Sequence, residues 1–286
     1  MVDAIVTPRG PYSLRLTARG AADATRRFRD GLLVAALERE GRVERAAATQ
    51  RPDGRVHLRA DSEHSLERLR FCLALDADHS EFLRRFARDP LLGRTVRLLP
   101  GLRRLRVPTV AHALLRALCG QLVEARQARA IERRIVCRAT RALDGLHAAP
   151  TGADLARFSP AELRRLGLHA RRGATLVRLC RSLDLERLRE QPVAVVRERL
   201  VRERGLGPWS VGVIGLEGLG RTELGLVGDL GLVKLLAALR GRRAEAWETE
   251  ELLAPYGEWA GLASVYLLAG WAQGLVPVPR VERRAA

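Results

Sequence analysis

The segment from residue 200 to 234 carries the residues whose types and spacing could do chemistry. Apolar helical periodicity ends at Arg204, the turn Gly205-Leu206-Gly207 follows, and Pro208 suits the first turn of a new helix because its φ is fixed. Glycines let a turn approach an anion closely, and amides at a helix N-terminus point at that anion. The pattern predicts two helices joined by a hairpin, over about residues 197–218, that binds a backbone phosphate. A tight connection without a ligand is the alternative, since glycine routinely caps helices.

A carboxylate follows this hairpin about twenty residues later. Asp229 comes after Gly228 and opens the apolar helical run Leu230-Gly231-Leu232-Val233. Its side chain is therefore expected at a helix N-terminus that faces the hairpin. An ordinary N-cap is the alternative interpretation, since N-caps favour Asp, and the two roles are compatible.

The two motifs together resemble those of the helix-hairpin-helix DNA glycosylases, which end in a Gly/Pro-rich loop and an aspartate. Within that superfamily the alkylbase, or 3-methyladenine type II, glycosylases are the most similar. The resemblance extends upstream over most of the chain, through the stretches Pro100–Arg103, Ala113–Val123 and Leu166–Leu168, the last followed by Arg172 and Ala174.

The resemblance implies a role for each residue of the site. Asp229 would be the catalytic carboxylate, because cleavage of an N-glycosidic bond needs a negative charge near the developing oxocarbenium ion. The base pocket would include Trp209, Gln121 and Glu124. DNA binding would involve Gly205, Leu206, Gly207 and Ser210, with Leu122 filling the vacated stack.

Two of these residues also have ordinary structural explanations, and a third departs from the family pattern. Trp209 could stack on an extruded base, or it could be a core residue between the two hairpin helices. Gln121 could be a satisfied polar residue of a helix. Glu124 stands where the family usually has a small hydroxyl residue, so it is a departure from the pattern.

A strand-nicking lyase activity would need an amine nucleophile to form a Schiff base with the sugar. In the lyase-active relatives that lysine lies in the hairpin, where this sequence has Trp209. Lys234 is the only lysine in the sequence, and it lies off the face of Asp229 on the expected helix, where a solvated helix lysine is the simpler interpretation. We therefore expect a monofunctional enzyme.

Two further departures from the family pattern bear on which bases the protein would accept as substrates. Tyr266-Leu267-Leu268-Ala269-Gly270-Trp271 replaces the paired aromatic residues of the family's last helix, and Glu203-Arg204 replaces an apolar-Pro entry to the hairpin. Cationic alkylated bases of the 3-methyladenine and 7-methylguanine type leave easily and need little pocket chemistry. They are the expected substrates, released from duplex DNA to initiate base-excision repair.

The composition agrees with a polyanionic partner. The 286 residues carry a formal net charge of +17, and nucleic acid is the commonest partner of such a chain. Nearly all of this charge is arginine, which suggests coding bias and weakens the argument. A hydrophobic content of 47% excludes a disordered chain and predicts a globular protein.

The sequence gives no sign of a metal site, a cofactor or a membrane segment. The four cysteines, at positions 72, 119, 137 and 180, form no CxxC pair, so buried reduced thiols are expected, with no metal and no cofactor. The N-terminus lacks the pattern of a secretion signal, and no apolar run approaches the ~20 residues of a membrane helix. A monomer in the cytoplasm, associated with the nucleoid, is expected.

The expected fold class is α+β: a mostly α-helical helix-hairpin-helix core with a small N-terminal antiparallel sheet. Period-two alternation predicts strands at 12–16, 42–46 and 55–60, with a turn at Asp53-Gly54, and helices at 21–37 and 65–73. The predicted domains are 1–80 and 81–286. In the second, helical periodicity predicts helices at 110–119, 122–138, 153–166, 170–183 and 193–204.

Three alternatives remain open at this stage. A catalytically inactive helix-hairpin-helix protein could bind DNA or lesions without chemistry, although phosphate binding alone needs no carboxylate at position 229. A glycosylase for another damaged base would share the fold. An RNA-binding helical protein could use the arginine charge alone.

Overall fold

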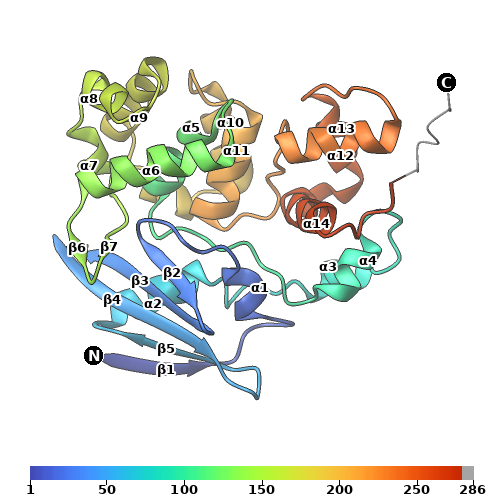
Figure 1. Cartoon of the computed structure of the whole chain (residues 1–286), viewed down its shortest axis with the longest axis horizontal. Coiled ribbons are helices and arrows are strands. Elements are labelled where there is room, and N and C mark those ends of the chain that lie inside the picture. Colours follow the sequence, from blue (N-terminus) through green and yellow to red (C-terminus); the bar gives the residue numbers. More distant parts are fainter. Residues whose placement is uncertain (279–286) are drawn as a thin grey trace.

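The computed structural model describes residues 1–278, so residues 279–286, which fall within the predicted second domain, lie outside the description. The fold class is α+β, as predicted, with a small antiparallel sheet at the N-terminus and helices after it. The sheet lies beneath one group of helices, and a second group lies to its side (Figure 1).

The sheet has five antiparallel strands in the order β1-β5-β4-β3-β2. The strands are β1 (Val2–Val6), β2 (Arg26–Arg29), β3 (Leu32–Arg39), β4 (Arg42–Gln50) and β5 (Val56–Ala60). Helix α2 (Glu63–Cys72) packs on one face, where Leu33, Leu37, Leu58 and Leu69 share an apolar core. The strands predicted at 42–46 and 55–60 and the helix at 65–73 are therefore present.

Two predictions for the N-terminal segment were wrong. Residues 12–16 contain the start of α1 (Leu14–Ala18), because the Ser13 hydroxyl caps the helix by accepting a hydrogen bond from the Leu16 amide. Residues 21–37, expected to be helical, form β2 and most of β3. Asp30 and Gly31 both have positive φ, +51° and +79°, which gives the two-residue turn that matches strand twist in a hairpin.

The helices from residue 80 onward follow the predicted periodicity with local differences. The element Ala153–Leu166 is two helices, because Ser159 and Glu162 form a capping box and Pro160 begins a second helix. A short hairpin, β6 (Ala142–Leu143) and β7 (Leu146–His147), turns at Asp144-Gly145 in a region expected to be helical.

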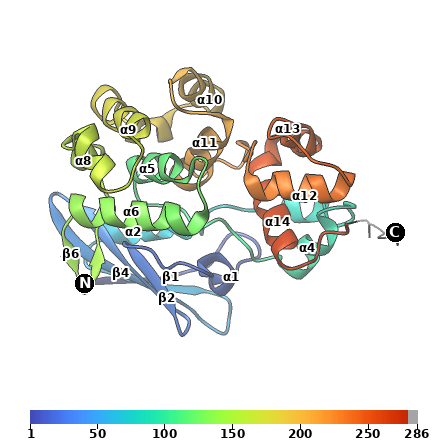
Figure 2. The same cartoon turned by 45° about the horizontal axis from the view of Figure 1, so that its top comes forward.

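The helices form two lobes, one above the sheet and one to its side (Figures 1 and 2). The hairpin lobe contains α5 (Val110–Gly120), α6 (Ala125–Ala139), α7 (Gly152–Ala156), α8 (Pro160–Arg165), α9 (Ala170–Ser182), η1 (Glu186–Glu190), α10 (Val193–Arg202), α11 (Pro208–Val213) and η2 (Ile214–Leu219). The aspartate lobe contains α3 (Ser80–Arg85), α4 (Gly93–Leu98), α12 (Leu230–Arg240), α13 (Glu248–Leu253), η3 (Ala254–Trp259) and α14 (Ala260–Ala272).

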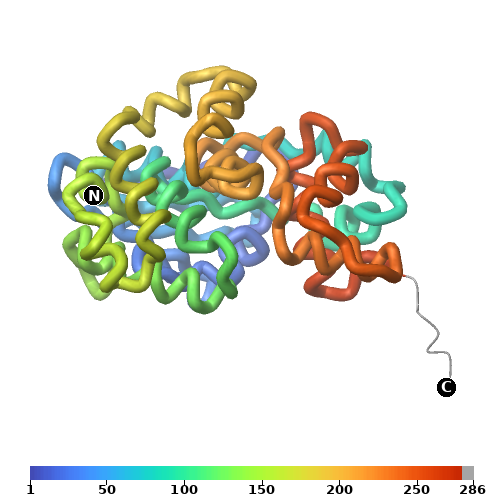
Figure 3. Tube along the Cα trace, turned by 90° about the horizontal axis from the view of Figure 1, so that it is seen from above, coloured from blue at the N-terminus to red at the C-terminus, as the bar shows by residue number. Residues whose placement is uncertain are grey.

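The chain crosses between the two lobes twice. Residues 99–109 lead from α4 to α5, and residues 220–229 lead back from η2 to α12. Seen from above, the two lobes lie side by side with the C-terminal one at the edge of the molecule (Figure 3). Any site formed between the hairpin and Asp229 therefore lies where the lobes meet.

A buried ionic cluster joins the sheet to the hairpin lobe. The Arg116 guanidinium on α5 contacts Asp23 at 2.9 Å, Glu132 at 2.7 Å and Glu217 at 2.8 Å, and Arg104 also pairs with Glu217. Burial alone would raise the pKa of Glu217, but the two guanidinium groups outweigh it and hold the pKa at about 2. The cluster therefore keeps its charges at neutral pH and fixes four chain segments around α5.

Candidate DNA interface and active site

The predicted hairpin is present between α10 and α11. Gly205 has φ of +97°, and a Cβ there would lie 2.5 Å from the Thr175 hydroxyl oxygen, so glycine is required. Pro208 begins α11, as predicted. Among residues 1–278 the amides of Gly207 and Trp209 have no hydrogen-bond partner, so both are available to an anion at the turn.

Gln121 connects the end of α5 to this hairpin. Its side-chain amide donates to the Gly205 carbonyl oxygen and to the Ser210 hydroxyl, both at 2.9 Å. Ser210 is only 1% exposed, so its side chain supports the turn, and its backbone amide is the part that faces outward from the helix start. Gln121 therefore lies at the hairpin turn and holds it in place.

Leu122 projects from the molecule directly after Gln121. Its side chain is 98% exposed and its φ is +54°, a conformation that costs a branched residue of order 1 kcal/mol. The turn also explains why α6 begins at Ala125 and not at residue 122. An exposed leucine on a strained backbone beside the hairpin has the form expected of a residue that inserts into DNA.

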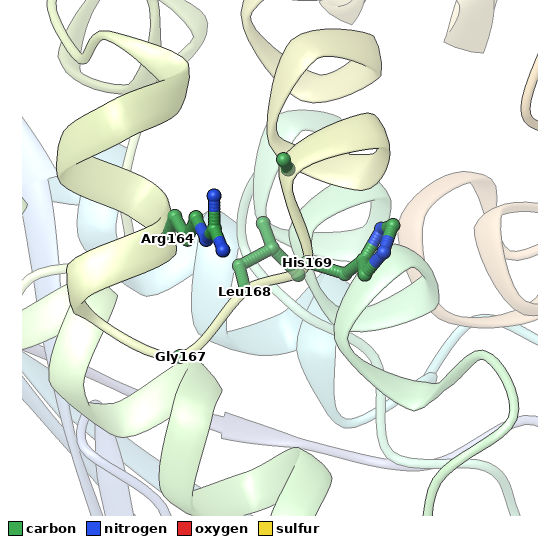
Figure 4. A pocket seen from close by; sticks show the side chains of 5 residues that line it. Arg164, Gly167, Leu168 and His169 are labelled. Carbon is green, nitrogen blue, oxygen red and sulfur yellow. The ribbon is translucent and has the colours of Figure 1, made fainter.

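A cavity of about 340 Å³ separates Leu122 from α9. It is lined by Gln121, Leu122, His169, Arg171, Arg172, Thr175 and Gly205. A second cavity, of about 240 Å³, adjoins it through the shared His169 at the connection between α8 and α9 (Figure 4). Arg171 and Arg172 were not predicted to line the site, because two arginines in an arginine-rich chain give no local signal.

Asp229 is held by hydrogen bonds from two directions. As the N-cap of α12, its Oδ1 accepts from the amides of Gly231 at 2.8 Å and Leu232 at 3.4 Å. Its Oδ2 accepts from the indole Nε1 of Trp209 at 2.9 Å. The structure thus brings together the predicted catalytic residue and a predicted pocket residue, and Asp229 has the N-cap role as well.

The segment that delivers Asp229 is fixed by close backbone contacts. A Cβ on Gly212 of α11 would overlap the Gly225 carbonyl oxygen, and one on Gly261 of α14 would lie 2.6 Å from the Thr222 carbonyl oxygen. The Leu226 amide donates to Ser264 at 3.1 Å. The glycines therefore let residues 222–226 pass between α11 and α14, one helix from each lobe.

Glu124 and Lys234 are both exposed surface residues. Glu124 is exposed at the start of α6, and its side chain makes no capping hydrogen bond. Lys234 is exposed on α12. Trp209 packs its ring against Gly120, where a Cβ would lie 2.5 Å from Cη2, so it is a packed residue as well as a partner of Asp229.

The last helix contributes an aliphatic neighbour to this region. A Cβ on Gly231 would lie 2.5 Å from a methyl carbon of Leu268, which places Leu268 beside the first turn of α12. Tyr266 instead points into the core, where its hydroxyl donates toward the carbonyl oxygens of Leu99 at 3.1 Å and Leu102 at 3.2 Å. Tyr266 is therefore a structural residue.

Two further searches concern metals and membranes. Within residues 1–278 no three His, Cys, Asp or Glu residues are grouped so that they could hold a metal ion. No helix in the same part of the chain has the length and apolar character needed to span a membrane.

Comparison with known proteins identifies the fold. The 3-methyladenine DNA-glycosylase of Archaeoglobus fulgidus superposes with a TM-score of 0.76 at 19% identity, covering 94% of this chain and 98% of the other. The 8-oxoguanine glycosylase/lyase of Clostridium acetobutylicum, in complex with double-stranded DNA, gives 0.76 at 17% identity, covering 96% and 99%. The chain has the fold of the helix-hairpin-helix DNA glycosylases.

A sequence relative agrees with this assignment. A DNA-3-methyladenine glycosylase of Bacillus subtilis is 24% identical over 204 residues, which is 68% of this chain and 67% of the relative. No family model matches. The resemblance to helix-hairpin-helix glycosylases, near the alkylbase type, is thus confirmed.

Proposed function

We propose that the protein is a monofunctional DNA glycosylase that hydrolyses the N-glycosidic bond of alkylated bases, of the 3-methyladenine and 7-methylguanine type, in duplex DNA. The observation that carries the proposal is the pairing of Asp229 with Trp209, which fixes a carboxylate beside a helix-hairpin-helix turn. The names of the Bacillus and Archaeoglobus proteins support the substrate class.

Asp229 would stabilise the transition state by its charge. As the C1′–N bond breaks, its electron pair leaves with the base and positive charge develops on the deoxyribose. A carboxylate already oriented by the Gly231 amide and the Trp209 indole needs no reorganisation at that moment. Water then adds to C1′ and loses a proton, which leaves an abasic site.

The hairpin would position the DNA for this step. The free amides of Gly207 and Trp209 would bind one phosphate without reading sequence, and Gln121 would keep the turn in place. Leu122 would occupy the space left by the extruded nucleotide, since it is the most exposed large apolar side chain of the described part of the chain.

Hydrolysis without strand cleavage follows from the residue at position 209. Trp209 occupies the place of the hairpin lysine and uses its indole N–H for Asp229, and the only lysine of the sequence, Lys234, is exposed on α12. The protein would act as a cytoplasmic, nucleoid-associated monomer without a cofactor, with residues 1–80 as an N-terminal domain beside the catalytic core.

Base release from methylated duplex DNA tests the proposal. Wild type and Asp229→Asn are incubated with the DNA, free bases are quantified, and alkali is added to reveal abasic sites. Release by wild type alone, with nicks only after alkali, supports the proposal.

Each other result has a defined meaning. Release of an oxidised base such as 8-oxoguanine, but of no methylated base, would show that the substrates are oxidised bases and not alkylated ones. Nicks without alkali would exclude the monofunctional mechanism. Tight binding of damaged DNA with no release of any base would indicate a lesion-binding protein.

A further inference from the structure

The connection between α12 and α13 has the composition of a nucleic-acid-binding surface. Its sequence is Gly-Arg-Arg-Ala-Glu-Ala-Trp, residues 241–247. Trp247 is 63% exposed, and the Arg243 side chain is 89% exposed. Figure 1 shows this connection arching over the aspartate lobe before α13 begins. Tryptophan is highly buried on average in proteins, so a tryptophan that is 63% exposed, four residues after an exposed arginine, is uncommon.

The end of this connection is fixed directly against the residue that precedes Asp229. The Gly228 amide donates to the Thr249 hydroxyl at 2.7 Å, and that hydroxyl donates to the Ala246 carbonyl oxygen at 2.7 Å. A Cβ on Gly228 would lie 3.7 Å from the Ala246 Cβ. Trp247 therefore stands at the start of α13, between two residues that contact the residue before Asp229, on the lobe opposite the hairpin.

The loop is ordered mainly by the ion pairs of Glu248, and Arg243 takes no part in these. Glu248 pairs with Arg240 and, at 2.5 Å, with Arg242, and it also accepts from the Glu245 amide at 2.6 Å. Arg243 has one contact, with Glu245 at 3.5 Å between two exposed side chains. Because the loop is already ordered, little further conformational entropy would be lost when Trp247 and Arg243 bind a ligand.

We propose that Trp247 and Arg243 form a second DNA contact on the aspartate lobe, in which Arg243 binds a backbone phosphate and Trp247 packs its ring against the strand that flanks the extruded nucleotide. The proposal rests on the proposed function, because it places duplex DNA between this loop and the hairpin. The positive charge of Arg243 and the formal net charge of +17 of the whole sequence favour a polyanion as the occupant, and aromatic rings stack on bases of any sequence. Leu230, the residue after Asp229, is also exposed, at 60%.

Binding to inert DNA tests the contact without any chemistry. The Kd is measured for a duplex with a tetrahydrofuran abasic-site analogue and for an undamaged duplex, across a series of salt concentrations. Trp247→Ala should weaken binding to the abasic duplex by about tenfold, and Trp247→Phe should recover most of that loss. Arg243→Gln should weaken binding to both duplexes and reduce the salt slope by about one.

Arg29→Gln is the matched control for the charge. The Arg29 side chain is 88% exposed and pairs with neighbouring Asp30 at 3.2 Å, much as Arg243 pairs with Glu245, but it lies in the sheet. Both substitutions remove one exposed positive charge. A difference in Kd between the two variants therefore reports the effect of where the charge lies on the protein. Unfolding midpoints equal to wild type would establish that each variant folds.

The outcomes separate this proposal from the proposed function. If wild type releases methylated bases while Trp247→Ala binds as wild type and Arg243→Gln behaves as Arg29→Gln, the contact is disproved and the function stands. If no base is released but the two variants lose DNA affinity as expected, the contact stands and the enzymatic function fails. If wild type binds neither duplex, both are wrong.

Discussion

The indole N–H of Trp209 donates a hydrogen bond to Oδ2 of Asp229, and this bond joins the second helix of the hairpin to the first turn of α12. One residue belongs to the hairpin lobe and the other to the aspartate lobe. The position of the carboxylate relative to the phosphate-binding turn is therefore set by direct contact between the two motifs.

Trp209→Phe should lower the rate of base release about tenfold while leaving DNA affinity within about twofold. The phenyl ring still fills the space against Gly120, but Asp229 loses one of its orienting donors, and a hydrogen bond to a charged group contributes roughly 1.5–3 kcal/mol. Single-turnover release and duplex binding are the measurements. An unchanged release rate would show that the N-cap amides alone orient the carboxylate.

Leu122→Gly should stabilise the protein while impairing base release. Glycine adopts the positive φ of this position without strain, so the unfolding free energy should rise by about 1 kcal/mol. The loss of the exposed side chain should reduce release and affinity for the abasic duplex. Urea unfolding and single-turnover assays check the two effects, and Leu122→Ala, which keeps the Cβ, should impair release without the gain in stability.

Gly212→Ala should both destabilise the protein and reduce activity. The new methyl group would overlap the carbonyl oxygen of Gly225, so the segment that carries Asp229 must move. Overpacking of this kind costs about 1–3 kcal/mol. Gly152→Ala is the control, since a Cβ there meets nothing closer than the Cys180 carbonyl oxygen at 4.0 Å. Equal unfolding midpoints for the two variants would contradict the proposed packing.

The buried ionic cluster should make stability sensitive to acid. The pKa of Glu217 is lowered in the folded protein from 4.5 to about 2, so unfolding takes up a proton in this range. The contribution is fully present above about pH 5 and is lost as the pH falls toward 2, at a cost of about 3 kcal/mol for this group. Urea unfolding between pH 6 and pH 2 measures this loss of unfolding free energy.

Arg116→Met tests the same cluster at neutral pH. The substitution leaves Asp23, Glu132 and Glu217 buried without their shared partner, which should cost about 3–5 kcal/mol. A flat pH profile in this variant, together with a steep one in wild type, would assign the acid sensitivity to Arg116. Retention of wild-type stability would contradict this role.

The sequence was sufficient to predict the parts of the site that depend on local chemistry. The hairpin at Gly205–Gly207 and the helix start at Asp229 follow from glycine, proline and N-cap preferences, which act over a few residues. Leu122 was predicted from its place after Gln121, and its exposure and positive φ agree with that role.

The parts that sequence reasoning missed depend on contacts between distant segments. Arg116 lies in an apolar helix, and nothing near it shows that Asp23, Glu132 and Glu217 surround it. Trp247 is brought near Asp229 by the hydrogen bond between Gly228 and Thr249, which are 21 residues apart in the sequence. The wrong helix at 21–37 has a local cause, because the Asp30-Gly31 turn signal was overlooked.

The two crossings between the lobes bring the ends of the hairpin lobe together. The Val107 amide donates to the Glu217 carbonyl oxygen at 2.8 Å, so the chain enters and leaves this lobe at neighbouring points. Topologically, the hairpin lobe is an insertion within the aspartate lobe, whose helices come from both sides of it along the chain. A segment with adjacent ends is suited to exchange as a cassette, and such an exchange would replace the phosphate-binding turn while leaving Asp229 on its original scaffold.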